Sequence, residues 1–143
     1  MTATVLVDTN VFTARLRERS PLATSYAKHL FGQRIAVAPQ TVAEARYGAL
    51  SAGWGVARVE RLSRLIARAR VLPVDIDTIE AVAQLRNECR QIGHGLHQRG
   101  HNADLWIAAT AIRWRIPLVA HDAVFDGCPG LELRTELDTR RAY

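Results

Sequence analysis

Four acidic residues stand where apolar runs of the sequence meet helical patterns, at positions that could bring their carboxylates together. Asp8 directly follows the apolar run 5–7, and Asp122 comes just after the apolar run 116–120. Glu44 and Asp104 lie near the starts of two helical patterns. Carboxylates that converge repel one another strongly unless a cation is present. A shared site for these four side chains therefore implies a bound metal ion.

The chemistry of such a site follows from its ligands. Oxygen ligands alone, with no His or Cys at metal-ligand spacing, select Mg²⁺ or Mn²⁺ over Zn²⁺. A hard cation held by a few carboxylates keeps waters and binds phosphate oxygens. It can activate water and stabilise the leaving oxygen, which is the chemistry of phosphodiester hydrolysis.

Each acid also has a structural explanation, and this is the commoner one for any of them taken singly. Asp8 could cap the helix that follows it, and Asp122 could cap a short helical turn. Residues 41–44 have a capping-box pattern, with Glu44 at its third helical position. Asp104 suits the positive end of a helix dipole. Only convergence of the four would favour chemistry.

Short apolar runs alternate with longer helical patterns along the chain, with no repeat, low-complexity tract or linker. This alternation predicts βαβ units in one domain spanning residues 1–143, with a mainly parallel sheet of four to five strands covered on both faces. The expected strands are 4–7, 34–38, 71–74, 116–120 and 131–133, and the expected helices are 9–19, 20–31, 41–52, 56–69, 77–92 and 102–115.

Ligands of such open sheets bind beyond the carboxyl ends of the strands. This rule places Asp8 and Asp122 at that edge, since both stand at or just past a predicted strand end. We expect helices that precede a strand to begin on the opposite side. The rule therefore leaves Glu44 and Asp104 unplaced.

Composition and charge restrict the class of protein. The chain has 143 residues, a net charge of +5 and 19 basic residues, of which only Lys28 is a lysine. The arginines favour a polyanionic partner, although a GC-rich genome gives the same bias. Cys89 and Cys128 are interpreted as packing residues, although they could pair. No signal-peptide pattern or membrane-length apolar run is evident, so the protein is expected in the cytoplasm, without membrane contact.

Four segments, in order and at fitting spacings over nearly the whole chain, resemble the motifs of PIN domains. The first is VLVDTN at 5–10, which contains Asp8, and the second is TVAEARYG at 41–48, which contains Glu44. The third is NADLWIAA at 102–109, and the fourth is LVAHDAVF at 118–125. Each is weak alone, but four in order are specific. The short chain is similar to the VapC toxins of toxin–antitoxin pairs.

The resemblance implies a three-layer α/β/α PIN-like fold in which Asp8, Glu44, Asp104 and Asp122 meet around one or two Mg²⁺ or Mn²⁺ ions. It implies an endoribonuclease that cuts RNA through metal-activated water. It also implies a cognate VapB-like antitoxin and a homodimer. Thr9 matches the position whose hydroxyl orients Asp8 or a water on the metal.

Two features depart from the family pattern, both near the fourth acid. Ala120 stands where the family often has Thr or Ser, so a supporting hydroxyl is absent there. Asp126 is close to Asp122 in the sequence and could share or replace its role as a metal ligand.

Other residues allow more than one role. The loop 93–101 holds three histidines and could bind Zn²⁺, touch RNA through Arg99 and His101, or be merely solvated. A helix face carries three arginines that could steer RNA, although Glu60 can pair with Arg64. These arginines are Arg61, Arg64 and Arg68.

Five further aromatic and apolar residues are expected in the core, with a protein interface as the alternative. They are Tyr47, Leu50, Trp54, Trp106 and Trp114.

Other functions on a similar sheet can be weighed against these residues. A phospho-acceptor receiver needs a lysine at a later strand end, but Lys28 lies in an early helix. A haloacid-dehalogenase-type phosphatase needs a second acid at the position of Asn10. A non-catalytic nucleic-acid- or protein-binding module and a DNA-directed nuclease remain as alternatives.

Overall fold

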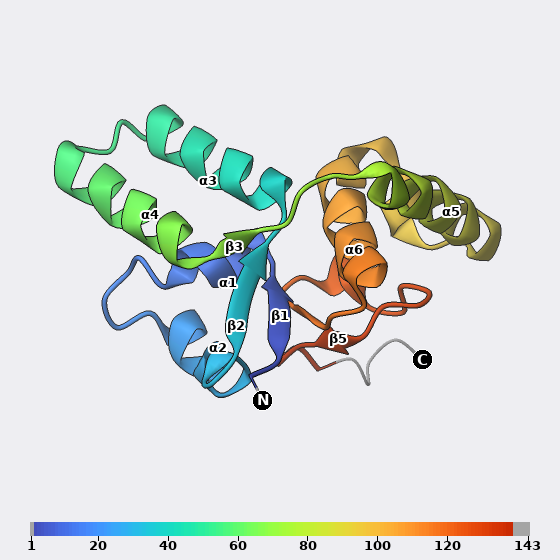
Figure 1. Cartoon of the computed structure of the whole chain (residues 1–143), viewed down its shortest axis with the longest axis horizontal. Helices are drawn as coiled ribbons and strands as arrows, with labels where there is room; N and C mark the ends of the chain where they lie inside the picture. The colour runs from blue at the N-terminus through green and yellow to red at the C-terminus, as the bar shows by residue number, and fades with distance from the viewer. Residues whose placement is uncertain (1, 139–143) are drawn as a thin grey trace.

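A five-stranded parallel sheet forms the centre of the computed structural model, which describes residues 2–138 (Figure 1). The strand order is β3-β2-β1-β4-β5, and every neighbouring pair is parallel. β1 is the middle strand, with β2 and β3 on one side and β4 and β5 on the other. The strands are β1 (Thr4–Val7), β2 (Arg34–Val37), β3 (Arg70–Val71), β4 (Leu118–Val119) and β5 (Leu133–Arg134).

Helices cover both faces of this sheet. Leu6 points to a core formed with α5 (Ile76–Ile92) and α6 (Asn102–Trp114), whereas Val5 and Val7 point to a core formed with α1 and α2. Alternate residues of β1 are thus buried on opposite faces, which explains its uninterrupted apolar sequence. The expected three-layer α/β/α fold is confirmed. The other helices are α1 (Thr9–Ala14), α2 (Pro21–Leu30), α3 (Pro39–Ser51) and α4 (Val56–Arg68).

The helices α3 and α4 form a hairpin that projects from the sheet (Figure 1). Its turn is the predicted break at 53–55, where Gly53 adopts a φ of 64° that favours glycine. Ala45 and Ala49 of α3 pack against Leu62 of α4 in a small cluster of their own. The hairpin therefore has a local core beside the two large ones.

Several element boundaries differ from the sequence-based expectations. The first helix ends at Ala14 rather than near Arg19, and Arg19 itself has a φ of 59°. β3, β4 and β5 are only two residues long. The third helix begins at Pro39, two residues before Thr41, because proline is favourable in a first helical turn. Two short 3-10 helices, η1 (Gly95–His97) and η2 (Arg99–His101), occupy the expected loop 93–101.

The expectation that helices preceding a strand begin on the far side of the sheet is wrong. In a parallel sheet, a crossover helix runs against the strands, so it starts at their carboxyl ends and finishes beside the next strand's amino end. α3 follows β2 in this way, and α6 ends just before β4. Both helices therefore begin at the edge where Asp8 lies.

The cysteines and two of the tryptophans follow their predicted roles, whereas two positions on α3 do not. Cys89 and Cys128 are free and buried, as expected of packing residues. Trp106 and Trp114 are partly buried against the larger core. Tyr47 and Leu50 are 72% and 80% exposed, so the expectation that they pack in the core is wrong. Within residues 2–138, no helix is long and apolar enough to cross a membrane.

The hydroxyl of Tyr26, on α2, makes hydrogen-bonding contacts with two other segments of the chain. Its side chain is fully buried, and its hydroxyl lies 3.1 Å from the carbonyl oxygen of Ala120 and 2.8 Å from Nδ1 of His121. The backbone N–H of Glu136 donates to the same hydroxyl at 2.9 Å. This one oxygen links α2 to the segment after β4 and to the segment after β5.

Tyr26→Phe is expected to destabilise the protein by roughly 1–3 kcal/mol, because it leaves buried backbone groups without a partner. Urea denaturation followed by circular dichroism measures this change. Tyr47→Phe is the matched control and should change stability by less than about 0.5 kcal/mol, because Tyr47 is exposed. Equal stability of the two variants would contradict the role assigned to Tyr26.

Candidate active site

Asp8 is held at the carboxyl end of β1 by two backbone amides. Its Oδ1 accepts from the N–H of Val11 at 3.0 Å, which makes it the N-cap of α1. Its Oδ2 accepts from the N–H of His121 at 3.3 Å, from the segment that follows β4. Only 3% of the residue is exposed. The capping role and the strand-end position predicted for Asp8 are both confirmed, and they coexist.

The surroundings of Asp8 oppose its negative charge. Burial is the largest cause, and it raises the pKa of this carboxyl to about 7. The two amide hydrogen bonds lower the pKa, whereas the nearby carboxylates of Asp122 and Asp104 raise it further. The fold thus buries a carboxylate and surrounds it with like charges, an arrangement that a cation would relieve.

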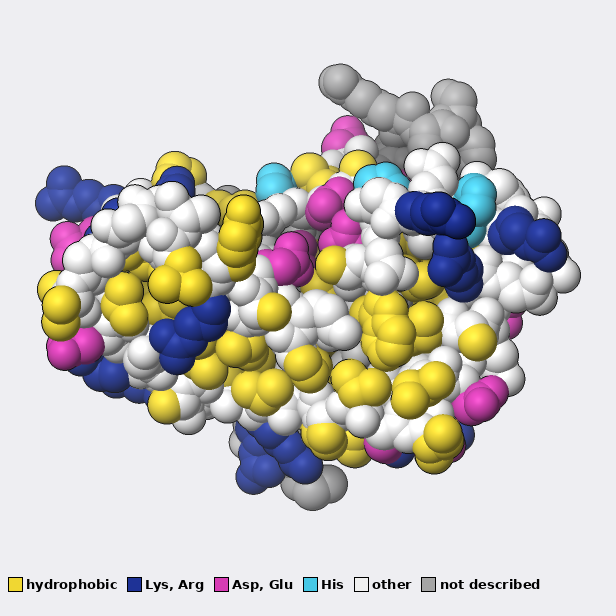
Figure 2. All heavy atoms as spheres, turned by 90° about the horizontal axis from the view of Figure 1, so that it is seen from above, with side chains coloured by type: hydrophobic (Ala, Val, Ile, Leu, Met, Phe, Trp, Pro, Cys, Tyr) yellow, Lys and Arg dark blue, Asp and Glu magenta, His cyan; other side chains and the backbone are white. Residues whose placement is uncertain are grey.

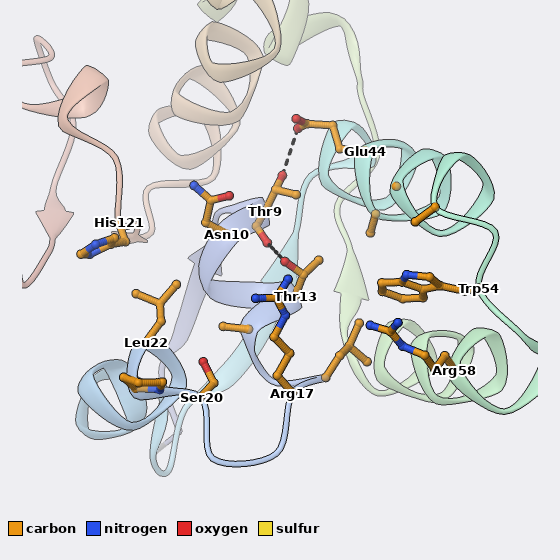
Figure 3. A pocket seen from close by; sticks show the side chains of 16 residues that line it. Thr9, Asn10, Thr13, Arg17, Ser20, Leu22, Glu44, Trp54, Arg58 and His121 are labelled. Atoms are coloured by element: carbon orange, nitrogen blue, oxygen red, sulfur yellow. Dashed lines mark hydrogen bonds between the residues drawn. The ribbon is translucent and has the colours of Figure 1, made fainter.

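Glu44 reaches the same edge from α3. Because α3 begins at Pro39, Glu44 lies in its second turn, and the N-cap Ala38 makes no side-chain cap hydrogen bond. The predicted capping box is therefore wrong, and Glu44 is free of that structural role. Its Oε1 accepts from the hydroxyl of Thr9 at 2.9 Å (Figure 3). Thr9 thus orients Glu44, whereas the resemblance implied that it orients Asp8 or a water.

Asp104 lies in the first turn of α6 and is partly buried. Burial raises the pKa of its carboxyl, and the charges of Asp122 and Glu44 raise it further. His101 acts in the opposite direction, with its Nδ1 3.7 Å from Oδ2 of Asp104. The carboxyl of Asp104 thus interacts electrostatically with two of the other three acids, Asp122 after β4 and Glu44 on α3.

Asp122 precedes the short helix η3 (Ala123–Phe125), and its Oδ1 accepts from the N–H of Val124 at 3.0 Å. Its charge raises the pKa of both Asp8 and Asp104. Asp126 closes the same turn, and its backbone carbonyl is 2.7 Å from Nε2 of His94. This arrangement favours Asp122 over Asp126 as the fourth acid.

The four acids share one electrostatic neighbourhood, although they come from four segments of the chain. Figure 2 shows acidic side chains gathered in a hollow between the two ends of the molecule. Within residues 2–138, no three His, Cys, Asp or Glu side chains are gathered tightly enough to enclose a metal ion. Mg²⁺ suits loosely spaced acids, because it keeps several waters and needs only one or two direct carboxylates. The all-oxygen donor set and the buried charge of Asp8 fit such an ion.

A cavity of about 840 Å³ lies between α1 and the α3–α4 hairpin, and Glu44 is the one of the four acids that lines it. Thr9, Asn10, Glu44 and His121 are part of its lining, and Trp54 also lines it, stacked against a guanidinium (Figure 3). Sequence reasoning did not single out the contribution of His121, whose amide holds Asp8. The only sign in the sequence that His121 belongs to the site is its position directly before Asp122 in the fourth motif. It also missed the cationic lining of this cavity, which consists of Arg17 and Arg58.

The histidine-rich loop has a structural role in this fold. Both ring nitrogens of His94 are engaged, Nε2 with the carbonyl of Asp126 and Nδ1 with the N–H of Leu96. Nδ1 of His97 lies 2.6 Å from the carbonyl oxygen of His94. These hydrogen bonds fix the loop against the segment that carries the fourth acid, and His101 is its contact with Asp104.

Comparison with known proteins identifies the family. The model of the PIN domain matches residues 5–130 of the chain, which include all four acids. The chain belongs to the PIN domain family. It is also 33% identical to Ribonuclease VapC5 of Mycobacterium tuberculosis over 133 residues, which cover 90% of this chain and 92% of that protein. The PIN fold predicted from the sequence motifs is therefore confirmed.

Solved structures agree with this PIN assignment. The VapBC-5 toxin–antitoxin structure from Mycobacterium tuberculosis has a TM-score of 0.68 at 31% identity, covering 93% of this chain and 98% of that one. The VapBC2 structure from Rickettsia felis, bound to a promoter DNA fragment, has a TM-score of 0.76 at 21% identity and covers 92% and 98%. The latter likeness shows the fold alone.

The raised pKa of Asp8 predicts how stability depends on pH in the metal-free protein. The folded state binds this proton more tightly than the unfolded chain, whose carboxyl has a pKa near 3.8. Asp8 therefore makes its whole contribution to the free energy of unfolding below pH 3.8. This contribution is lost as the pH rises towards the folded-state pKa of about 7. We expect the free energy of unfolding in EDTA to fall by up to roughly 4 kcal/mol over this range.

Urea denaturation in EDTA at a series of pH values measures this decline, and Asp8→Asn should remove most of it, leaving the contribution of Asp104. Asp77→Asn, on the exposed surface of α5, should retain it. Added Mg²⁺ should stabilise the native chain at high pH and much less at low pH, since only the ionised carboxylate is a ligand. A native profile that is flat between the two pKa values would contradict the burial of an ionisable Asp8.

Proposed function

We propose that this PIN-domain protein is a Mg²⁺- or Mn²⁺-dependent endoribonuclease and the toxin of a toxin–antitoxin pair. The observation that carries the proposal is the buried Asp8, whose pKa is raised by burial and by Asp122 and Asp104. A fold that needs no chemistry at this edge has no reason to bury a carboxylate among like charges, because this arrangement reduces stability.

The metal-holding residues in this proposal are Asp8, Asp104 and Asp122, with Glu44 beside them. A bound divalent ion would supply charge stabilisation for the phosphodiester and lower the pKa of a bound water. The chain's own groups fix the arrangement. The amides of Val11 and His121 orient both oxygens of Asp8, and the hydroxyl of Thr9 holds Glu44 facing the cavity.

RNA is the proposed substrate because the ribonuclease VapC5 of Mycobacterium tuberculosis is 33% identical across nearly the whole chain. The positive net charge of +5 suits any nucleic acid. A DNA-directed nuclease is the enzymatic alternative on the same four acids. A non-catalytic binding module is disfavoured, since all four acids are present and converge on one edge.

A VapB-like antitoxin is the proposed protein partner, because the structural relatives include VapBC complexes. The hairpin offers such a partner an apolar surface, where Tyr47 and Leu50 are exposed at a spacing of three residues on α3. Trp54 lines the neighbouring cavity. A homodimer and a single nuclease domain over residues 1–143 belong to the same proposal.

Charge-neutral variants of the acids test the proposed nuclease. We expect Asp8→Asn, Asp104→Asn and Asp122→Asn each to reduce cleavage of a labelled RNA by about a hundredfold or more, because each removes charge that holds the ion. EDTA should abolish cleavage, and Mg²⁺ or Mn²⁺ should restore it. Asp126→Asn is the matched control and should retain most of the activity.

Three outcomes would overturn or revise this assignment. Unchanged cleavage by Asp8→Asn would show that the activity belongs to a contaminant or to another site. Loss of activity in Asp126→Asn, with Asp122→Asn unaffected, would move the fourth ligand to Asp126. If a single-stranded DNA of the same sequence were cut at an equal rate, the activity would be that of a general nuclease and not of a ribonuclease.

A further inference from the structure

Four arginines lie along one side of α4 and form what we call the arginine stripe. Arg58, Arg61, Arg64 and Arg68 are spaced three, three and four residues apart, so they share one side of the helix. Arg58 lines the cavity that contains Glu44. The other three line a second cavity of about 230 Å³, to which one further arginine, Arg15, contributes.

The two cavities adjoin each other. Leu16, just after α1, lines both of them. Arg58, at the N-terminal end of the stripe, lies in the cavity that Glu44 also lines, and Figure 3 shows it beside Trp54. From Arg58 to Arg68 the helix rises about 15 Å, which is long enough to contact several phosphates. The stripe extends the candidate active site along α4.

Residues 2–138 supply no ion-pair partner to the arginines around the second cavity. Among the described residues, none of the four arginines that line it has a carboxylate within ion-pair distance, and the predicted pair between Glu60 and Arg64 is not formed. Elsewhere, Arg113 is paired with Asp75 at 2.6 Å. Arg61 donates to the carbonyl oxygen of Leu16, also at 2.6 Å, which fixes its position. Several guanidinium groups that line one cavity without counter-charges favour a bound anion.

We propose that this arginine stripe binds the phosphate backbone of single-stranded RNA on its way from the acids, an inference that rests on the proposed ribonuclease function. The stripe would hold phosphates several nucleotides from the scissile bond. Arg64 and Arg68 would contribute affinity without touching the reacting atoms. Guanidinium groups match phosphate oxygens through paired hydrogen bonds and read no sequence.

The chemistry of the lining favours RNA over an acidic protein segment. The second cavity is lined by four arginines and two apolar side chains, Leu16 and Leu65. A backbone with one charge on every unit suits such a surface, whereas protein interfaces have an apolar core. The exposed apolar side chains that suit a protein partner lie instead on α3, at Tyr47 and Leu50.

The test measures RNA binding without cleavage, in the full chain carrying Asp8→Asn. The affinity for a labelled single-stranded RNA is measured by fluorescence anisotropy over a range of salt concentrations. Arg64→Gln and Arg68→Gln together should weaken binding several-fold. They should also reduce the slope of log K against log salt by about 1.4, because each lost phosphate contact removes about 0.7 from it.

Arg86→Gln with Arg90→Gln is the matched control, since it makes the same charge change at the same spacing on α5, where both side chains are exposed. This control should leave the slope nearly unchanged. If both double variants changed the RNA affinity and the salt slope equally, only the net charge of the protein would matter, and the proposal would be overturned. Loss of binding to a polyglutamate peptide, with RNA binding intact, would assign the stripe to an acidic protein segment and overturn it as well.

These outcomes are separable from the fate of the proposed nuclease. If the native chain cuts RNA and the α4 variants bind it normally, the stripe proposal fails alone. If the α4 variants lose RNA affinity while the native chain cuts nothing, the stripe still binds RNA and the nuclease proposal fails.

Discussion

The burial of the Asp8 carboxylate is the constraint on which the rest of the site depends. One oxygen starts α1, and the other accepts from the segment that follows β4. The same side chain therefore joins the central strand, its following helix and the neighbouring crossover. Its ionisation is opposed by burial and by two other acids. Burial favours the neutral form of this carboxyl, whereas the proposed metal site needs its charged form, and a bound divalent cation would stabilise that charge.

Parallel topology explains how four distant segments supply one acidic edge. β1 and β4 are neighbours in the sheet, so Asp8 and Asp122 emerge side by side. α3 and α6 begin at the same edge because crossover helices run against the strands. Glu44 and Asp104 are then placed by their distance along those helices. Each of the four acids lies within three residues of a strand end or in the first two turns of a helix.

The sequence was sufficient for the fold, and it singled out four acids that the structure brings into one electrostatic neighbourhood. Uninterrupted apolar strands and helical spacing predicted the layers, and the ordered motifs predicted the PIN family. The capping box at residues 41–44 was wrong because Pro39 starts α3 earlier. Tyr47 and Leu50 looked like core residues because sequence periodicity does not show which helix face lacks a partner. The contacts of Tyr26 and His121 join residues about 95 positions apart, and no local pattern encodes them.

Glu44 differs from the other acids in what supports it. Asp8, Asp104 and Asp122 are anchored beside the two large cores, whereas Glu44 stands on a hairpin whose own core contains Ala45, Ala49 and Leu62. Small clusters open at a lower free-energy cost than the centre of a domain. The position of Glu44 therefore depends on this small cluster and on Val42 and Ile66, which join the hairpin to the core of α1 and α2. Loosening of the hairpin would withdraw one carboxylate while the sheet and the other three stayed folded.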